Sequence, residues 1–396
     1  MNILYLGLPT LKTLSCHGIY SDVLRELSRL GHNIFCVTAV ERRNKEKTHL
    51  INDNYGKLIV VKTMNIQKTN IFEKGIGTLL IPHQFTRAIN KLLNNQKFDL
   101  ILYPTPPITL YGTIKRIKKQ SKATTYLMLK DIFPQNAVDL GLMKKKGLLY
   151  RYFRNKEKKL YQVSDKIGCM SPANVEYVLK HNSEVKKEKV EICPNCIEPQ
   201  DFSLSFEEAK KMRIKYGIPL DKRIFVYGGN LGKPQGIDFL IKSLQRLKEN
   251  KDVFFLIVGN GTEYGKLHSF LENGNFQNVK LIKMLPKEDY DRMIASCDVG
   301  LIFLDYRFSI PNFPSRLLSY LQVGLPILAC TDENSDIGQF VEKEGIGVWC
   351  PSNDVERFAE AVNNFDFTKE YYYLVRSILY KYFTIDNAVK CIEGAK

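Results

Sequence analysis

The sequence predicts an α/β protein with two similar domains, each built on a parallel, Rossmann-like sheet. Short apolar runs alternate with amphipathic stretches at helical spacing through the first half of the chain. The same alternation begins again near residue 223, after the pattern loosens over residues 194–222. A length of 396 residues also suits about two domains.

We place the two predicted domains at residues 1–195 and 196–380. Residues 381–396 predict a C-terminal helix, for which crossing back to the first domain is one option. In the first domain we expect a helix over 18–30 and strands at 2–8, 34–38, 57–62, 98–103 and 124–129. In the second domain we expect a helix over 287–296 and strands at 223–227, 253–258, 279–283, 299–304 and 326–329.

Composition restricts the class of protein. The chain has 44% hydrophobic and 25% charged residues, as globular proteins do, and no apolar run long enough to cross a bilayer. Its start, Met1 to Gly7, reads as a first strand and not as a signal peptide, so we expect a cytoplasmic protein. Nine scattered cysteines do not make a disulfide framework. Cys193 and Cys196 predict two buried thiols at a strand end, because a zinc site needs further ligands.

The stretch from Ile310 to Pro326 predicts a loop that becomes a helix over 315–324. Prolines precede it, Ser315 suits the N-cap, and Gly324 suits the position after the last turn. A helix N-terminus next to the charge of Arg316 predicts an anion site, most simply for phosphate. The alternative is an ordinary capped helix with a solvent-facing arginine.

The net charge of +16 is unevenly placed. Residues 1–200 contain 33 Lys and Arg against 16 Asp and Glu, whereas residues 201–396 contain 25 against 26. We therefore expect an anionic partner for the first half only. The densest basic run predicts a helix that contacts an anionic membrane surface, with the basic residues Lys144, Lys145, Lys146, Arg151 and Arg154. The alternative is an amphipathic helix whose aromatic residues face the domain core.

Three motifs follow one another in the second half. They are Gly228-Gly229-Asn230-Leu231-Gly232, then the run from Ile257 to Gly261, then Phe313-Pro314-Ser315-Arg316. Their order resembles the nucleotide-sugar domain of GT-B glycosyltransferases, among them the family-4 enzymes of bacterial capsule and O-antigen assembly. The fucosamine-transferase-like branch is especially similar. The first half agrees, with His17-Gly18 before a helix and with the run from Leu129 to Gln135.

The resemblance implies a GT-B fold, in which two Rossmann-like domains face each other across a cleft. It implies a metal-independent, retaining glycosyltransferase of hexosyltransferase type, with a UDP-sugar donor and no cofactor. An N-acetylated amino sugar is one candidate for the transferred group, and a lipid-linked saccharide is the implied acceptor. The enzyme would then be peripheral at the inner face of the plasma membrane. The implied donor-binding residues are Gly229, Asn230, Lys233, Gln235, Gly259, Asn312, Pro314, Ser315, Arg316 and Ser319.

The chain departs from this family at charged positions. Two glutamates that many members carry correspond to Pro311 and Ser319 here, and an Arg and a Lys correspond to Asn230 and Gln235. We therefore expect Ser319 to contact the ribose. Balance of the phosphate charge is expected from the cations Arg316 and Lys233, with Arg307 as a further candidate.

On the acceptor side, the resemblance implies a loop at Gly18 and the catalytic candidates His17, Lys130 and Asp131. An imidazole or carboxylate there would accept the proton of the attacking hydroxyl. The alternatives are a structural histidine and a solvated turn aspartate.

Asp332 to Asp336 resembles the start of a calcium loop, but Ile337 and Lys343 occupy the places of its glycine and glutamate. The segment follows a predicted strand, so contact with the sugar or the acceptor is one interpretation and a plain acidic loop the other.

Other functions stay open at this point. A UDP-sugar 2-epimerase shares the architecture, and the missing glutamates favour a non-catalytic basic binding protein. A nucleic-acid-binding protein fits poorly, because the sequence has no zinc spacing, RRM-type aromatic motif or basic zipper. Formation of an epimer from a UDP-sugar alone would favour the epimerase.

Overall fold

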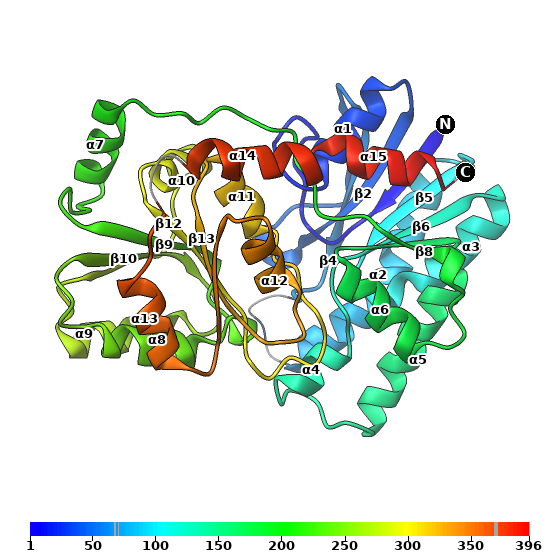
Figure 1. Cartoon of the computed structure of the whole chain (residues 1–396). Helices are drawn as coiled ribbons and strands as arrows, with labels where there is room; N and C mark the ends of the chain where they lie inside the picture. The colour runs from blue at the N-terminus through cyan, green and yellow to red at the C-terminus, as the bar shows by residue number, and fades with distance from the viewer. Residues whose placement is uncertain (67–68, 70, 368–370, 396) are drawn as a thin grey trace. The chain divides into compact units, whose positions relative to one another are not determined.

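The computed structural model describes residues 1–66, 69, 71–367 and 371–395 (Figure 1). The chain divides into two compact units. Unit 1 comprises Met1–Glu198 with Phe383–Lys396, and unit 2 comprises Pro199–Tyr382. The division therefore lies three residues beyond the predicted one, and the C-terminal segment belongs to unit 1.

Unit 1 has an eight-stranded sheet among its described residues, in the order β3-β4-β2-β1-β5-β6-β7-β8. The strands are β1 (Asn2–Leu6), β2 (Asn33–Glu41), β3 (His49–Asp53), β4 (Gly56–Thr63), β5 (Leu100–Pro104), β6 (Thr124–Leu129), β7 (Lys166–Cys169) and β8 (Val190–Ile192). All pairs are parallel except that of the edge strand β3 with β4. The predicted strands are confirmed within a few residues. Strands β3, β7 and β8 were not predicted. The edge strands β3 and β8 have no buried residue and so lack the apolar pattern of the others.

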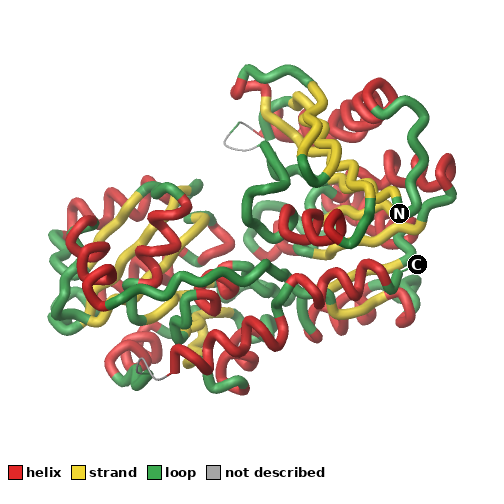
Figure 2. Tube along the Cα trace, turned by 90° about the horizontal axis from the view of Figure 1, so that it is seen from above, coloured by secondary structure: helices red, strands yellow, loops and turns green. Residues whose placement is uncertain are grey.

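The helices of unit 1 lie on both sides of its strands (Figures 1 and 2). They are α1 (Ser21–Arg29), α2 (Ile71–Leu92), α3 (Tyr111–Ser121), α4 (Gln135–Asp139), α5 (Leu148–Val163), α6 (Pro172–His181) and α15 (Ile385–Glu393). The last helix packs near the start of the chain. His32 joins the two ends, because its Nδ1 lies 3.1 Å from the amino group of Met1 and its Nε2 lies 2.8 Å from Glu393 Oε1.

Unit 2 has a six-stranded sheet among its described residues, in the order β11-β10-β9-β12-β13-β14, and every pair is parallel. The strands are β9 (Arg223–Asn230), β10 (Val253–Asn260), β11 (Val279–Ile282), β12 (Val299–Phe303), β13 (Ile327–Thr331) and β14 (Gly347–Pro351). The helices are α7 (Phe206–Lys215), α8 (Ile237–Arg246), α9 (Tyr264–Gly274), α10 (Lys287–Ala295), α11 (Arg316–Gln322), α12 (Ile337–Lys343), α13 (Val355–Asn363) and α14 (Tyr371–Tyr382).

The strand order of unit 2 decides where a ligand can bind. The chain runs outward from β9 to β10 and β11, then returns to add β12 on the other side of β9. In such sheets, ligands bind at the carboxyl ends of the strands where this order reverses. The loops after β9 and β12 therefore mark the site to search first.

Both units are built on apolar strands, which places their cores between sheet and helices. All of β12 and the central residues of β9 and β10 are buried, as expected for a parallel sheet covered on both faces. None of the helices within the described residues is both long and apolar enough to span a bilayer.

Candidate functional site

The glycine loop, which begins at Gly229 near the end of β9, is shaped by one unusual backbone angle and one close backbone approach. Gly229 has a φ of +129°, a conformation that side chains rarely adopt. A Cβ atom on Gly259, at the end of β10, would lie 2.0 Å from the carbonyl oxygen of Gly229. Both positions therefore require glycine, and the exposed backbone of this loop is open to a ligand.

Arg316 lies against this loop. Its guanidinium carbon is 4.2 Å from the ring centroid of Tyr227, and its Nη2 would be 3.2 Å from a Cβ atom on Gly229. Its Nη1 is buried and has no hydrogen-bond partner. The Arg316 residue is half-buried, but a buried donor atom without a partner is costly unless an anion completes its contacts. The arrangement therefore fits an anionic ligand at the glycine loop.

Tyr320, on the same helix as Arg316, fixes α11 against the sheet. Its hydroxyl lies 3.1 Å from the oxygen of Val226 and 3.0 Å from the oxygen of Leu301, and it accepts a hydrogen bond from Gly228 N at 3.3 Å. These contacts join α11 to β9 and β12. Arg316 is thus held at the point where the strand order reverses.

The helix itself differs from the prediction. It spans Arg316–Gln322, seven residues, and the side chain of Ser315 makes no capping hydrogen bond, because Ser315 already has helical dihedral angles. So short a helix contributes little dipole, and the charge of Arg316 carries the attraction for an anion. The predicted role of Gly324 is confirmed by its φ of +69°.

Asn230 and Gln235 bind each other. Asn230 Nδ2 donates to Gln235 Oε1 at 2.9 Å, and Gly232 N donates to the same oxygen at 3.2 Å. These side chains hold the loop in shape, so the direct donor contact expected of them finds no support here. Lys233 is exposed beside them. Arg307 is tied to Asp305 by two hydrogen bonds of 2.8 and 2.7 Å, which occupy its guanidinium.

The loop at Asp332 supports the approach to α11. Asp332 accepts hydrogen bonds from Asn334 N, Ser335 N and Ser335 Oγ, each at 2.9 Å. Ser335 Oγ in turn accepts a hydrogen bond from Asn312 N at 2.9 Å. Burial raises the pKa of Asp332 to about 6. The acidic segment is therefore an internal brace for Asn312 and not a free acidic loop. Pro314 and Ser319 lie nearby in the same segment and are half-buried, whereas Ser315 is exposed.

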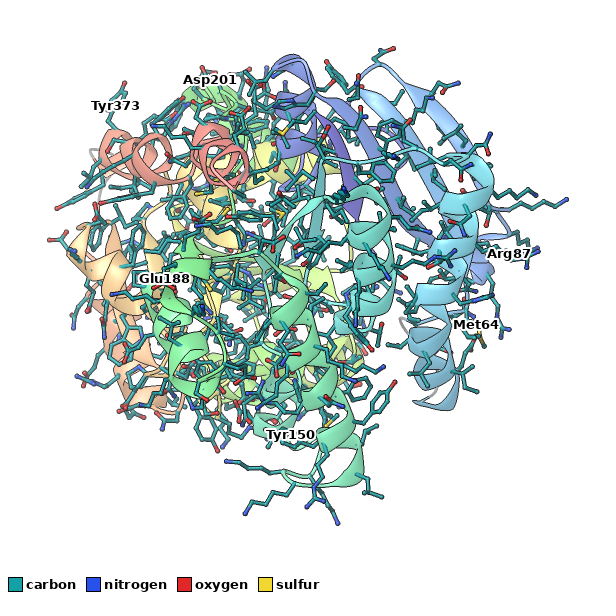
Figure 3. All side chains as sticks on the ribbon, turned by 90° about the vertical axis from the view of Figure 1, so that its right-hand side faces the viewer. Met64, Arg87, Tyr150, Glu188, Asp201 and Tyr373 are labelled. Carbon is teal, nitrogen blue, oxygen red and sulfur yellow. The ribbon has the colours of Figure 1, made fainter. Side chains whose placement is uncertain are left out.

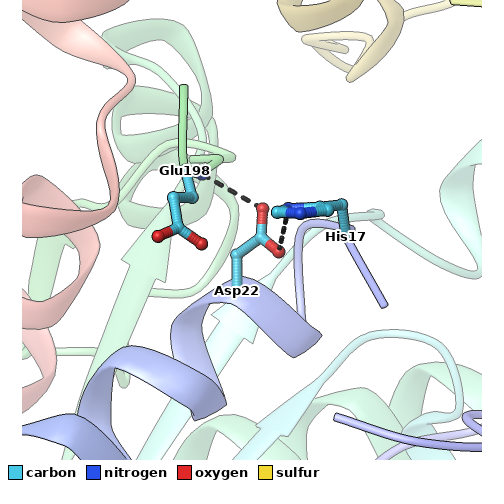
Figure 4. A group of neighbouring side chains, drawn as sticks. All are labelled: His17, Asp22 and Glu198. Atoms are coloured by element: carbon cyan, nitrogen blue, oxygen red, sulfur yellow. Dashed lines mark hydrogen bonds and ion pairs between the residues drawn. The ribbon is translucent and has the colours of Figure 1, made fainter. Parts of the chain in front are cut away.

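In unit 1, His17 belongs to a polar cluster at the start of α1 (Figure 4). Its Nδ1 lies 3.5 Å from Asp22 Oδ1 and 3.3 Å from Arg25 Nη2. Asp22 Oδ1 also accepts a hydrogen bond from Gly18 N at 3.0 Å, and Glu198 N donates to Asp22 Oδ2 at 3.0 Å. The ring is thus oriented through Nδ1, and the side chain is 40% exposed.

Arg25 is the centre of this cluster. It is buried and donates to the oxygens of Leu14 and Cys16, to Asp22 Oδ1 at 2.7 Å and to Glu198 Oε2 at 2.6 Å. The ligand atoms of His17, Asp22 and Glu198 lie within 4.8 Å of one another, which is a spacing that could hold a metal ion. The Arg25 guanidinium already bridges the carboxylates of Asp22 and Glu198, so it supplies the positive charge that a metal ion would bring.

Lys130 and Asp131 follow β6 but face different surroundings. Lys130 Nζ donates to the oxygen of Cys193 at 3.3 Å, and burial lowers the pKa of Lys130. This contact gives Lys130 a structural role, and its surroundings do not support the acceptor-side role expected of it. Both oxygens of Asp131 accept hydrogen bonds of 2.8 Å from Asn136 Nδ2, and burial raises the pKa of Asp131 to about 6. Asp131 is thus an anchored carboxyl and not a solvated turn residue.

Tyr227, Asp22, Arg25 and Glu198 were not predicted as site residues. Tyr227 looks like an ordinary core residue of a strand. Asp22 and Arg25 fit the polar positions of an amphipathic helix. Glu198 lies 173 residues from Arg25 along the chain, so no spacing connects them.

A family model now decides the class of the protein. Residues 208–366 match the model of the glycosyl transferases group 1. Unit 2 is therefore similar to group 1 glycosyltransferases over these residues. The protein is therefore a transferase, and the epimerase and the non-catalytic binding protein are set aside.

Relatives and solved structures agree with this assignment. The glycosyltransferase is 24% identical over 296 residues to "Probable glycosyltransferase WbjE" of Pseudomonas aeruginosa, with 75% of this chain and 72% of the relative covered. It is 25% identical to "Putative colanic acid biosynthesis glycosyl transferase WcaI" of Escherichia coli K12, with 67% and 66% covered. A sucrose-phosphate synthase from Thermosynechococcus elongatus superposes with a TM-score of 0.76 at 13% identity, covering 100% of this chain and 98% of that one. The fold is therefore GT-B.

The basic run of the glycosyltransferase forms an exposed tip at the start of α5, where long cationic side chains project around Tyr150 (Figure 3). Lys144, Lys145, Lys146 and Arg151 are exposed. Leu148 and Leu149 are 86% and 56% exposed beside them.

Arg154 does not belong to this tip, contrary to the prediction. It pairs with the buried Glu157 at 2.5 Å and donates to the oxygen of His181 and to Asn182 Oδ1, both at 2.7 Å. The ion pair makes it a structural residue. The apolar residues of α5 have different surroundings as well, because Leu160 is buried whereas Leu149 and Tyr152 are exposed.

Proposed function

We propose that this glycosyltransferase transfers a sugar, with retention of configuration, from a UDP-sugar to a lipid-linked saccharide during assembly of a bacterial capsule or O-antigen polysaccharide. An N-acetylated amino sugar is our first candidate, in line with the fucosamine-transferase-like branch. The name of WcaI refers to colanic acid biosynthesis, and a similar structure, WaaG, is described as involved in lipopolysaccharide biosynthesis. HepE of Anabaena, with a TM-score of 0.67, was solved in complex with UDP.

One observation carries the proposal. Arg316 places a buried, unpartnered Nη1 beside the glycine loop, at the reversal point of the unit 2 sheet. A diphosphate supplies the anionic oxygens that this donor lacks, and the loop leaves room for them.

The same cation suits the chemistry. Transfer breaks the bond between the anomeric carbon and the phosphate oxygen, forms a bond from that carbon to an acceptor hydroxyl, and releases UDP. Negative charge grows on the departing phosphate oxygen as the bond breaks. A donor fixed in advance, as Arg316 is by Tyr227, stabilises that charge without reorganisation. The acceptor proton leaves with the phosphate or with a nearby base.

A thermal-shift panel tests the donor. We expect UDP and UDP-sugars to raise the melting temperature, because a ligand of the native state stabilises it. The shift should vanish in Arg316→Met and persist in Arg246→Ala, which changes an exposed arginine of α8. Equal shifts in the unchanged protein and both variants would show that Arg316 is not part of the donor site. A larger shift with another nucleotide would show that the donor carries a base other than uracil.

The proposed acceptor and location depend on the basic tip, formed by Lys144, Lys145, Lys146 and Arg151. Exposed cations around exposed leucines are the features of a surface that binds anionic lipid. We therefore place the enzyme as a peripheral protein at the cytoplasmic face of the plasma membrane, where a lipid-linked acceptor would be presented. No metal or cofactor is included in this scheme, since the charge balance is assigned to Arg316 and Lys233.

Vesicle flotation tests the membrane contact. We expect binding to vesicles with an anionic phospholipid and little binding to neutral ones. Lys145→Ser with Lys146→Ser should weaken it, since each basic side chain contributes about 1 kcal/mol. Lys186→Ser with Lys187→Ser removes two other exposed lysines of unit 1 and is the matched control. Equal binding to both kinds of vesicle, or none, would contradict the idea.

A further inference from the structure

A groove of unit 2 lies at the edge of its sheet opposite to the glycine loop. Arg223 begins β9, Asp298 directly precedes β12 and Pro326 directly precedes β13, and all three line this groove. Since the strands are parallel, their amino ends share one edge, whereas Gly229 and Arg316 lie at the edge of the carboxyl ends. The volume of this amino-edge groove is about 960 Å³, within the range of about 300–1,000 Å³ that ligand sites have. The proposed transfer makes no use of it.

Contacts between side chains hold the walls of the amino-edge groove in place. Arg213 of α7 donates from Nη2 to both carboxylate oxygens of Asp298 at 2.9 Å and from Nε to the oxygen of Ser296 at 2.6 Å. These bonds fix α7 beside the start of β12. In another part of the lining, the ring of Tyr372 on α14 packs so closely on Gly324 that a Cβ atom would have no room there. The walls are therefore anchored within unit 2.

Aromatic side chains line the groove and are open to water. Phe206 on α7 is 73% exposed, and Tyr373, which projects from α14 in Figure 3, is 80% exposed. The half-buried rings of Phe202, Phe367 and Tyr372 also belong to the lining. Large exposed rings gathered at one concave place mark a binding site, because water solvates them poorly. An aromatic ring packs well against the C–H groups on the face of a sugar ring, whose hydroxyls then point to the sides.

The groove also carries positive charge. Lys210, Lys222 and Arg223 line it, and none of these three side chains forms an ion pair with a described residue. Asp298 is already neutralised by the arginine of α7, so Asp221 is the acid of the described lining that remains to balance them. Three cations against one acid leave an excess of positive charge, which favours an anionic ligand.

An acidic saccharide fits the rings and the cations together better than a polyphosphate does. Aromatic rings with basic side chains also occur in sites for single-stranded nucleic acid. Such sites track a continuous line of phosphates, however, and residues 201–396 contain 25 Lys and Arg against 26 Asp and Glu. A saccharide that carries carboxylates on some of its sugars needs only a few cations placed between stacking rings, as this groove has.

We propose that the amino-edge groove binds a stretch of an acidic polysaccharide that the enzyme helps to assemble. Phe206 and Tyr373 stack on sugar rings, and Lys210 and Lys222 bind the carboxylates of uronic acids along the chain. This role rests on the proposed function, since polysaccharide assembly is what supplies such a chain. Arg316 lies at the opposite edge of the sheet, so the saccharide and the donor nucleotide bind at separate places in unit 2.

Titration calorimetry of the full chain tests the groove with two hexasaccharides, an acidic galacturonate hexamer and neutral maltohexaose. We expect the galacturonate hexamer to bind at least about tenfold more tightly at low salt, because its carboxylates meet the lysines of the groove. Added salt should remove most of this difference, since it screens exposed charges. Saturating UDP should leave the Kd of the hexamer unchanged, because the donor site lies at the other edge of the sheet.

Lysine variants test the charge. Lys210→Ser with Lys222→Ser should weaken binding of the galacturonate hexamer about tenfold and leave that of maltohexaose unchanged, because only the acidic hexamer has carboxylates to bind. Lys242→Ser with Lys251→Ser removes two exposed lysines of unit 2 outside the groove and should change neither Kd. Equal weakening by both pairs of substitutions would show a general effect of charge and would overturn the groove as the site.

Aromatic variants test the stacking. Phe206→Ser with Tyr373→Ser should weaken binding of both hexasaccharides about tenfold, because two stacking surfaces are lost. Met284→Ser removes another large exposed side chain of unit 2, which is 79% exposed and lies outside the groove, and should change neither Kd. The thermal shift with UDP should persist in all of these variants, since none of them changes the donor site.

Other results would overturn the proposal. If the unchanged protein shows a thermal shift with UDP but binds neither hexasaccharide, the groove is not a saccharide site and the donor proposal stands. Displacement of the galacturonate hexamer by UDP would place that hexamer at the donor site. Tighter binding of a thymidine hexanucleotide would assign the groove to nucleic acid. A dimer in solution that Phe206→Ser dissociates would assign it to a second copy of the chain.

Discussion

Two arginines of this protein lie at matching places and have opposite surroundings. Arg25 follows the first strand of the unit 1 sheet, and Arg316 faces the loop after β9, the first strand of the unit 2 sheet. Arg25 donates to two backbone oxygens and to the carboxylates of Asp22 and Glu198. Arg316 rests on the ring of Tyr227, and its buried Nη1 has no partner.

The difference separates a structural charge from a functional one. A buried guanidinium whose donors are satisfied holds its elements together, and its removal leaves carboxylates unpaired. A buried guanidinium with a free donor carries a cost that the folded protein alone does not recover. The same substitution should therefore damage stability at one site and activity at the other.

The largest effect is expected from Arg25→Met. It leaves Asp22 and Glu198 without their common cation, so unfolding free energy should fall by about 3–5 kcal/mol. Arg29→Met is the matched control, because Arg29 also pairs with Glu198 but is 44% exposed. That change should cost at most about 1 kcal/mol. Urea unfolding measures both, and equal losses would contradict the role of Arg25.

Arg316→Met should have the converse result. We expect kcat/KM for the donor to fall about 100- to 1000-fold, as for the loss of one preorganised donor to a developing anion. Stability should stay the same or rise, because an unsatisfied buried charge is replaced by an apolar side chain. Steady-state kinetics and urea unfolding decide together. If Arg316→Met lost activity only because it unfolds, the proposed difference between Arg316 and Arg25 would be contradicted.

The pH dependence of stability should distinguish the carboxyls of Glu198 and Asp332. Hydrogen bonds from Arg29 and Arg25 hold the pKa of Glu198 below its usual range, whereas burial without a cation raises the pKa of Asp332 to about 6. The native state therefore holds the Asp332 proton up to about pH 6, where the unfolded chain has lost it above about pH 4. This group makes stability fall by as much as about 3 kcal/mol as pH rises between these values.

Two variants test the direction in which each carboxyl changes stability with pH. Asp332→Asn should remove the contribution of Asp332 to the fall between about pH 4 and pH 6, and the contribution of Asp131, whose pKa burial also raises to about 6, should persist. Glu198 acts in the other direction, since its stabilisation is present above the unfolded pKa and is lost as pH drops through the folded one. Glu198→Gln should therefore flatten the acid side only. Unfolding curves at several pH values measure both slopes, and identical profiles for the two variants would refute the assignment.

The smallest effect is expected from Gly229→Ala. The φ of +129° disfavours a side chain, and the new Cβ would lie 3.2 Å from Arg316 Nη2. Loop and guanidinium must then move apart, and we expect about a tenfold loss of kcat/KM. Gly265→Ala on α9 has open space around its Cβ and should leave the kinetics unchanged. An unchanged Gly229→Ala enzyme would mean that the loop does not approach the donor.

Much of the architecture could be predicted from local pattern. Apolar periodicity located most strands, and the glycines of β9 and the positive φ of Gly324 followed from residue type. The motif order pointed to the fold and the class of enzyme before any coordinates. Strands β3, β7, β8 and β14 were missed, and the edge strands β3 and β8 have no buried residue that would produce an apolar pattern.

The site was predicted only in part. Arg316 was expected at an anion site, and its unpartnered Nη1 agrees with that expectation. Asn230 and Gln235 were expected to contact the donor, and they hydrogen-bond to each other. Arg154 was expected to contact a membrane, and it pairs with the buried Glu157. A side chain of a given type can bind a ligand or pair with another side chain of the protein. The residue type alone does not say which of these two partners it has.

The sequence by itself determined the two α/β units, the uneven charge and the glycine loop, because these depend on residues close together in the chain. The tertiary structure decided which charges are satisfied. Glu198 reaches Arg25 across 173 residues, while Arg316 lies over the ring of Tyr227 and its Nη1 has no hydrogen-bond partner. Whether a buried charge is paired depends on neighbours that folding brings together. That pairing distinguishes a structural residue from one that binds a ligand.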